Sequence, residues 1–168
     1  MYKMTPTSVV LDDVLDSKYV SEIYKSLEES TKKSLVPSTS TFYGICDNHL
    51  YDDFCLSMIN IAEKFYDLSS SIGYEFWTRL NTRPTRWHQD NDVKLSKRGI
   101  IKFPLCSIVY YCYVENLSGG RLFIESDIIT PKTNRLVIFA PRLLHYVEDF
   151  IGDRASMLIN PWNRIVEG

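Results

Sequence analysis

Two histidines and one carboxylate are placed in this sequence so that they could bind a metal ion together. His88 and Asp90 stand two positions apart, and on a strand two such side chains point to the same side. His145 follows an apolar run and a turn at 141–142, so it can reach the same cavity from a different strand. Two histidines and one carboxylate with open coordination positions are the ligand set of non-haem Fe(II) sites. The motif His-x-Asp alone is common by chance, and a solvated histidine beside an aspartate is the simpler interpretation of it.

A cation downstream of this group adds a second kind of chemistry. Arg154 stands nine residues after His145 at the start of a predicted strand, and Ser156 follows two residues later. An arginine fork pairs bidentately with planar carboxylates and stays charged when buried. Ser156 shares its face and can donate a second hydrogen bond. The pair therefore indicates a site for a dicarboxylate behind the metal, although an arginine at a strand start is more often a surface residue.

In this order, the run HQD at 88–90, His145 and the run RAS at 154–156 resemble the Fe(II)- and 2-oxoglutarate-dependent oxygenases. The resemblance extends from about Trp77 to Trp162 and is similar to the prolyl-hydroxylase branch and to small oxygenases with a WHxD motif. It implies a double-stranded β-helix, a jelly-roll core of the cupin kind.

The resemblance also implies roles for single residues. His88, Asp90 and His145 would be the catalytic iron ligands. Arg154 would bind the distal carboxylate of 2-oxoglutarate, with Ser156 assisting. Tyr111 is the expected phenol donor to that carboxylate and Tyr110 is its rival, because adjacent strand residues face opposite ways.

The activity implied is hydroxylation of an unactivated C–H bond with Fe(II), 2-oxoglutarate and O2, and with ascorbate as a candidate reductant. Asp90 favours hydroxylation over halogenation, because the related halogenases lack this carboxylate. The expected substrate is a peptide or protein side chain. The alternatives are a free amino acid or other small metabolite, and a non-catalytic, cupin-like metal-binding protein. A zinc hydrolase ranks last, because no unassigned glutamate lies near His-x-Asp to act as a base.

The substrate side differs from that of the prolyl hydroxylases. Thr85 stands where they tend to have a tyrosine, and Trp77 and Arg79 stand near the place of another. These differences argue against a prolyl substrate. A basic stretch between 79 and 102 indicates either a solvated loop or a rim that attracts an anionic or peptide substrate. The candidate substrate residues are the following four: Arg83, Arg86, Trp87 and Trp162.

The elements that must position these residues fall into two halves. Apolar residues at steps of three and four predict helices over 16–33 and 52–70. After 73 the chain changes to short β-runs, over 74–81, 108–114, 121–124, 135–140 and 155–160. Short strands punctuated by glycine, proline and asparagine predict a sandwich, jelly roll or barrel. We expect one domain over 1–168, with supporting helices over 1–72 and the jelly-roll core over 73–168.

Composition bounds the remaining choices. The chain has 168 residues, 19 basic and 21 acidic side chains, and a net charge of −2, which excludes a broadly polybasic protein. No apolar run approaches a membrane span, and no secretory signal is visible, so we expect a cytoplasmic protein without a membrane partner. Nucleic acid is not an expected substrate, because demethylases typically add a recognition lid that the N-terminal half does not resemble. Four cysteines without CxxC spacing indicate buried thiols rather than disulfides.

Overall fold

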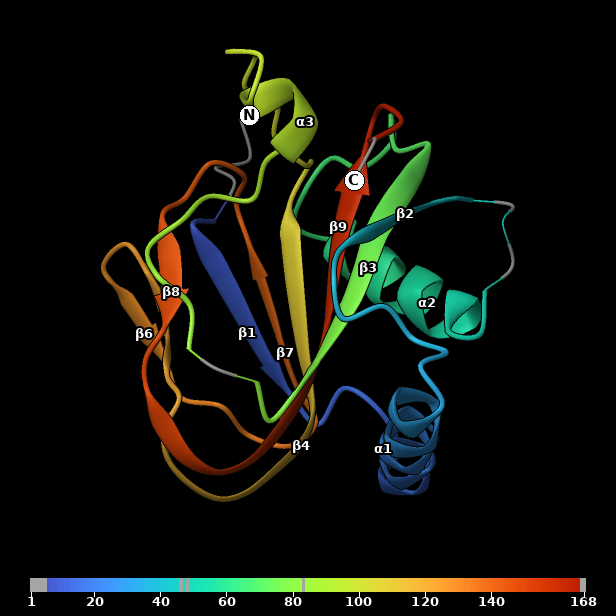
Figure 1. Cartoon of the computed structure of the whole chain (residues 1–168), viewed down its shortest axis with the longest axis vertical. Coiled ribbons are helices and arrows are strands. Elements are labelled where there is room, and N and C mark those ends of the chain that lie inside the picture. The colour runs from blue at the N-terminus through green and yellow to red at the C-terminus, as the bar shows by residue number, and fades with distance from the viewer. Residues whose placement is uncertain (1–5, 46, 48, 83, 167–168) are drawn as a thin grey trace.

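Two antiparallel sheets pack against each other in the computed structural model, which describes residues 6–45, 47, 49–82 and 84–166 (Figure 1). The larger sheet has the strand order β1 (Ser8–Asp12), β7 (Arg135–Phe139), β4 (Ser107–Gly119), β9 (Phe150–Trp162), β3 (Gly73–Leu80) and β2 (Thr41–Gly44). The smaller sheet has the order β6 (Asp127–Ile129), β5 (Leu122–Ile124) and β8 (His145–Val147). This arrangement confirms the predicted mainly-β, jelly-roll class.

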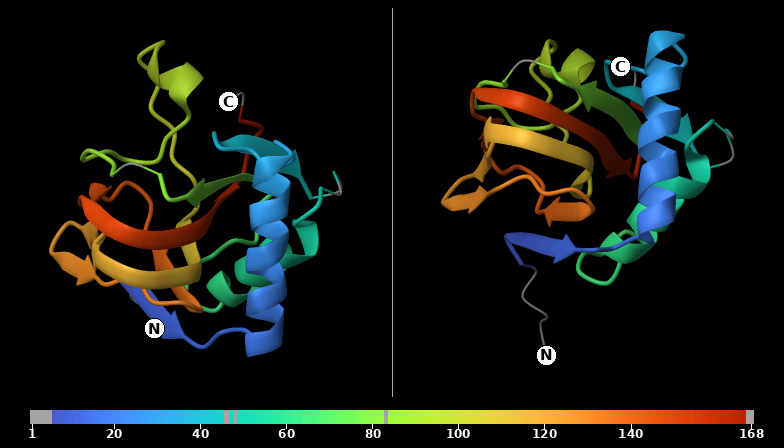
Figure 2. Two further views of the ribbon diagram at one scale, coloured as in Figure 1. Left: turned by 60° about the horizontal axis from the view of Figure 1, so that its bottom comes forward. Right: turned by 90° about the horizontal axis from the view of Figure 1, so that it is seen from below.

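The two faces of the larger sheet have different neighbours. Strand β4 shows the division, because Ile108 and Tyr110 belong to the core shared with the helices, whereas Val109 and Tyr111 belong to the core shared with the smaller sheet. Alternation along a strand produces this separation. Figure 2 shows the two long helices, over Ser17–Lys32 and Asp52–Ala62, on the side away from β5 and β6. The space between the sheets is therefore the place for a cavity.

Helix α1 (Ser17–Lys32) confirms the first helical prediction. Asp16 caps it, since its Oδ1 accepts a hydrogen bond from the backbone N–H of Lys18 at 2.9 Å. Helix α2 (Asp52–Ala62) is shorter than the predicted 52–70. Beyond it the backbone makes tighter turns, and the Tyr66 hydroxyl donates to the carbonyl of Pro6 at 2.8 Å. The helix therefore ends before residue 70, and the apolar residues that follow it pack through tertiary contacts instead.

The first 72 residues are not only helical, which corrects the prediction for that segment. Strand β1 pairs with β7, so Ser8 lies opposite Phe139, and β2 pairs with β3. Both strands form through partners distant in sequence, and local periodicity cannot indicate such pairing. The N-terminal segment therefore supplies both outer strands of the larger sheet as well as the helices.

The described cysteines are buried thiols, as the sequence predicts. Cys55, Cys106 and Cys112 are buried and unpaired, whereas Cys46 lies outside the described residues.

The segment after Asp90 is mostly irregular, as predicted for a loop. The segment 91–104 contains one short helix, α3 (Val93–Ser96), and no strand. Among the described residues, no helix combines the length and apolar character needed to cross a bilayer.

Candidate active site

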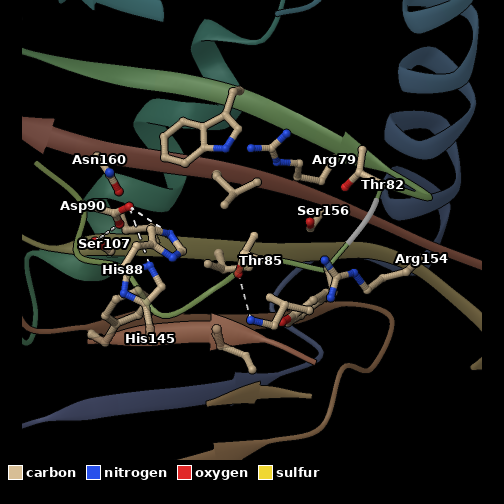
Figure 3. Close-up of a pocket in the computed structure, with 18 residues that line it drawn as sticks. Arg79, Thr82, Thr85, His88, Asp90, Ser107, His145, Arg154, Ser156 and Asn160 are labelled. Carbon is tan, nitrogen blue, oxygen red and sulfur yellow. Dashed lines mark hydrogen bonds and ion pairs between the residues drawn. The ribbon is translucent and has the colours of Figure 1, made fainter. Parts of the chain in front are cut away.

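A cavity between the two sheets collects most of the predicted site residues (Figure 3). Side chains of β3, β4, β7 and β9 in the larger sheet line one wall, and residues of β5 and β8 in the smaller sheet line the other. The segment 82–90 contributes Thr82, Thr85, His88 and Asp90. His88, Asp90 and His145 lie at one end of this cavity, and Arg154 lies at the other.

The backbone holds the two histidines side by side. The N–H of His88 donates to the carbonyl of His145 at 3.0 Å, and the N–H of His145 donates back at 2.9 Å. This isolated antiparallel bridge joins the segment after β3 to the start of β8. The ring centroids consequently lie 4.2 Å apart.

Hydrogen bonds to carbonyl groups determine the tautomer of each ring. His88 Nδ1 lies 2.7 Å from the carbonyl oxygen of Arg86, and His145 Nδ1 lies 3.0 Å from that of Leu143. A carbonyl only accepts, so each Nδ1 carries a hydrogen, and in the neutral ring each Nε2 keeps a lone pair. Metal-binding histidines are commonly oriented in this way.

Asp90 completes the group. Its Oδ1 lies 3.6 Å from His145 Nε2 and 3.9 Å from His88 Nε2. Its Oδ2 accepts a hydrogen bond from Ser107 Oγ at 2.6 Å, which leaves Oδ1 for the ion. One ligand atom from each of the three residues lies within 4.8 Å of the others. Two lone-pair nitrogens and one carboxylate oxygen on one side fit a divalent metal of the facial-triad type.

The pKa values of this group reflect the contact between opposite charges. Burial acts to raise the pKa of Asp90, but the hydrogen bond and charge of His145 and the Ser107 hydroxyl hold it below its usual range. Burial acts to lower the pKa of His145, and the contact with Asp90 raises it above its usual range. The side chain of His88 is 43% exposed, against 8% for that of His145. The metal end of the cavity is therefore its open end.

Arg154 is a buried cation without an acidic partner among the described residues. Its Nη1 donates to the carbonyl of Gly120 at 3.1 Å, and its guanidinium carbon lies 4.9 Å from the ring centre of Phe150 and 5.8 Å from that of Tyr111. Burial lowers the pKa of Arg154, yet a guanidinium remains charged in proteins. A buried unpaired charge is costly, so this position is suited to the carboxylate of a ligand.

The neighbours of Arg154 distinguish the two tyrosine candidates. Tyr111 lines the cavity and lies opposite Ser156 in the pairing of β4 with β9. Tyr110 faces the helices and donates its hydroxyl to Asn134 Oδ1 at 3.1 Å. Ser156 also lines the cavity. The structure thus brings Tyr111 and Ser156, and not Tyr110, to the cavity that holds Arg154.

Of the four candidate substrate residues, the three that the structure describes do not line this cavity. Trp162 is buried in a separate network, where its Nε1 donates to Glu75 Oε2 at 2.8 Å. Trp87 is 52% exposed and contacts Tyr146 outside the cavity, with the two rings tilted by 52° and their centroids 4.3 Å apart. Arg86 is exposed, and its carbonyl accepts from His88. Arg83 lies outside the described residues.

Several cavity residues were not singled out from the sequence as site residues. Ser107 orients Asp90, and Thr85 Oγ1 accepts from the N–H of Val147 at 2.9 Å, which ties the segment before His88 to β8. Asn160 is buried beside Asp90 (Figure 3), and Arg79 reaches into the cavity from β3. Two signals for Arg79 were present in the sequence: it stands near the place of a tyrosine of the prolyl hydroxylases, and it begins the basic stretch between 79 and 102.

The whole chain was compared with known proteins by sequence and by structure, and only the structural comparison gives matches. No family model matches the sequence, and no curated protein matches it. A Pseudomonas putida prolyl-4-hydroxylase is similar with a TM-score of 0.69 and 14% identity, over 95% of this chain and 94% of that chain. A Trichoplax adhaerens prolyl hydroxylase, solved with a hypoxia-inducible-factor peptide fragment, has a TM-score of 0.65 and 12% identity, over 94% and 84%.

A third similar structure is SnoK, a non-haem, α-ketoglutarate-dependent carbocyclase from nogalamycin biosynthesis. Its TM-score is 0.62 and its identity 11%, over 94% of this chain and 80% of that chain. At such identities the likeness concerns the fold. The chain therefore has the double-stranded β-helix fold of the 2-oxoglutarate- and Fe(II)-dependent oxygenases.

Proposed function

We propose that this protein is an Fe(II)- and 2-oxoglutarate-dependent oxygenase that hydroxylates an unactivated C–H bond. The observation that carries the proposal is the pairing of two sites in one cavity. Three converging ligand atoms stand at its open end, and a buried guanidinium without an acidic partner among the described residues stands at the other. The three ligand atoms suit a metal that binds a 2-oxo acid, and the guanidinium suits the distal carboxylate of that acid.

In this proposal His88, Asp90 and His145 hold the iron through Nε2, Oδ1 and Nε2. The bound Fe(II) supplies the activation of O2 that is coupled to decarboxylation of 2-oxoglutarate. The overall reaction converts a C–H bond, O2 and 2-oxoglutarate into C–OH, succinate and CO2. One atom of O2 enters the new hydroxyl group, and the other enters the carboxylate of succinate. A metal held by these three ligands would keep coordination positions for the co-substrate and O2.

Arg154 binds the distal carboxylate of 2-oxoglutarate in the same proposal. Its burial among Phe150 and Tyr111 excludes water that would otherwise compete for the anion. Ser156 and Tyr111 share the cavity wall and can donate hydroxyl hydrogens to the same group. These contacts orient the co-substrate toward the metal end.

We propose a peptide or protein side chain as the substrate. Similarity in fold to prolyl hydroxylases supports this choice. The partial exposure of His88 supports it too, since an open metal end can receive a segment of a larger molecule. The exposed Trp87 contacts the half-buried Tyr146, and these two aromatic residues are next to His88 and His145 in the chain. Aromatic side chains of this kind are favoured at binding surfaces.

The decisive experiment is an anaerobic titration of the protein with Fe(II) and then 2-oxoglutarate. We expect a visible metal-to-ligand absorption band in the wild type. In Arg154→Ala we expect the Kd of 2-oxoglutarate to rise at least 10-fold, because a charge-assisted pair is lost. Absence of the band in the wild type, or unchanged binding in Arg154→Ala, would reject the proposal. A non-catalytic metal protein of the cupin kind has no need of Arg154 and would give that second result.

A second measurement tests the substrate class. Succinate release is followed with peptides, free amino acids and a methylated DNA oligonucleotide. Peptides should raise the rate above the substrate-free background. Stimulation by amino acids or by the oligonucleotide, with none by peptides, would reject the peptide assignment and leave the oxygenase assignment intact.

A further inference from the structure

We infer that Arg79 binds the substrate, and that the substrate presents a carboxylate to it near the carbon that is oxidised. The inference rests on the proposed function and concerns the part of the cavity that the metal ligands and Arg154 do not explain. It names one chemical group, which a free acid or an acidic peptide could each supply.

Arg79 is placed by strand pairing in the row of residues that faces the cavity. It lies opposite Ser156 in the pairing of β3 with β9, and Ser156 lies opposite Tyr111 in the pairing of β9 with β4. Directly paired residues on neighbouring strands point to the same side of a sheet. Arg79 accordingly lines the cavity, and Figure 3 shows its guanidinium between Thr82 and the metal end.

The guanidinium of Arg79 has spare hydrogen-bonding capacity. Its Nη1 donates to the carbonyl of Ser38 at 3.3 Å, and no other hydrogen bond of this side chain is formed among the described residues. No described carboxylate lies within 4.0 Å of it; Glu75, on the same face of β3, is engaged by Ser40 and Trp162. A guanidinium has five N–H donors in a fixed fork, so most of them remain for a ligand.

Thr82 provides a second and independent indication of a ligand. Its Oγ1 is buried and has no hydrogen-bond partner in the described part of the chain. A buried hydroxyl without a partner costs about 1–3 kcal/mol, and such groups in native proteins call for an explanation. Thr82 lines the same cavity and lies beside Arg79 in Figure 3. One oxyanion between them would accept from both.

The charges of the filled cavity leave Arg79 without a counter-charge. Fe(II) and Arg154 bring three positive charges, and Asp90 and the two carboxylates of 2-oxoglutarate bring three negative ones. The histidines are neutral when they bind metal. The single positive charge of Arg79 is then balanced by a substrate with one negative charge, which fits a carboxylate better than a phosphate of nearly two.

Arg79 and Arg154 also repel each other, since the charge of Arg79 contributes to lowering the pKa of Arg154. Two separate anions would relieve this repulsion, one on each guanidinium. We therefore assign the distal carboxylate of 2-oxoglutarate to Arg154 and the substrate carboxylate to Arg79. A neutral proline ring leaves Arg79 and Thr82 unpaired, which agrees with the absence of the tyrosines typical of prolyl hydroxylases.

The test compares the wild type with Arg79→Gln, Arg79→Lys and Thr82→Val, using Lys25→Gln, which removes an exposed positive charge on α1 away from the cavity, as the control. The first readout is the Kd of 2-oxoglutarate from the anaerobic absorption band. We expect it to stay within about 2-fold of the wild type in all four variants. A rise in Arg79→Gln as large as that in Arg154→Ala would overturn the inference, because Arg79 would then bind the co-substrate.

The second readout is succinate formation with three series of probes: the free L-amino acids, their carboxamides, and N-acetylated, C-amidated tripeptides with a central Asp, Glu, Asn, Gln or Pro. We expect stimulation only by members that carry a carboxylate. For the best probe we expect kcat/KM to fall at least 10-fold in Arg79→Gln, to recover partly in Arg79→Lys, and to stay unchanged in Lys25→Gln. Stimulation by free acids and by acidic tripeptides distinguishes the two sources.

Three results would overturn the inference: equal stimulation by the carboxamides, unchanged kcat/KM in Arg79→Gln, or no stimulation by any carboxylate-bearing probe. Each of these leaves the absorption band in place. Loss of the band in the wild type instead rejects the proposed function itself, so the two failures are distinguishable.

Discussion

At the scale of single residues, Ser107 decides which oxygen of Asp90 faces the metal site. Its hydroxyl donates to Oδ2 at 2.6 Å and so orients Oδ1 toward the two Nε2 atoms. We expect Ser107→Ala to weaken Fe(II) binding about 10- to 100-fold, which is the usual effect of removing a partner that orients a metal ligand. The measurement is a metal titration. Ser118→Ala, on an exposed part of the same strand, is the control and should bind iron normally; equal affinities in all three proteins would contradict the prediction.

The sequence was most informative about residues whose chemical type is unusual for their position. His88, Asp90 and His145 could be grouped because histidines are few and the run HQD has the spacing of a strand. Arg79 and Thr82 were not identified, because their significance depends on the strand register that places Arg79 opposite Ser156. Side-chain alternation limits a strand residue to one of two faces, but it does not say which face borders a cavity.

At the scale of elements, an ion pair fastens the N-terminal strand to its neighbour. Arg135 on β7 donates to both carboxylate oxygens of Asp12 on β1, at 2.6 and 2.9 Å. The hydrogen bond from Arg135 is the largest cause that lowers the pKa of Asp12 to about 2 from its usual 3.8. A carboxyl group with a lowered folded-state pKa stabilises the fold above pH 3.8, and this contribution is lost as the pH falls toward 2.

We therefore expect Asp12→Asn to be less stable than the wild type at pH 6, and the difference to shrink as the pH falls below 4. Urea unfolding at a series of pH values measures it. Asp149→Asn removes an exposed carboxylate without such a partner among the described residues and serves as the control. A difference between Asp12→Asn and the wild type that does not change with pH would show that the ion pair contributes no pH-dependent stability.

Helices and strands with a long periodic pattern in their own sequence could be predicted. Strands that form only through pairing with segments distant in sequence could not. The stripe of α1 and the β-branched and aromatic run of β4 could be identified because they are long and periodic. Strands β6 and β8 have three residues each, and β1 pairs with a strand more than a hundred residues away. Their pairing energy comes from partners that a local window does not contain.

At the scale of the whole molecule, the larger sheet lies between the main hydrophobic core, which it shares with the helices, and the cavity that holds the candidate site. Leu27 on α1 is fully buried in the core on the helix side, whereas the cavity lies on the other side. We expect Leu27→Ala to lower the free energy of unfolding by about 2–5 kcal/mol. The Kd values of Fe(II) and 2-oxoglutarate should stay within about 2-fold of the wild type. Calorimetry and the anaerobic titration measure the two effects, and Leu35→Ala, at a position 64% exposed, is the control. A large loss of ligand affinity in the folded Leu27→Ala protein would show that the two sides are coupled.

The reciprocal backbone bridge between His88 and His145 has a consequence for how the protein acquires its metal during synthesis. His145 lies 57 residues after His88 in the sequence and is therefore the last of the three ligands to leave the ribosome. Until β8 pairs with β5 and the bridge forms, the nascent chain offers at most two of the three ligands. Tight loading with iron is therefore a late event that follows closure of the smaller sheet.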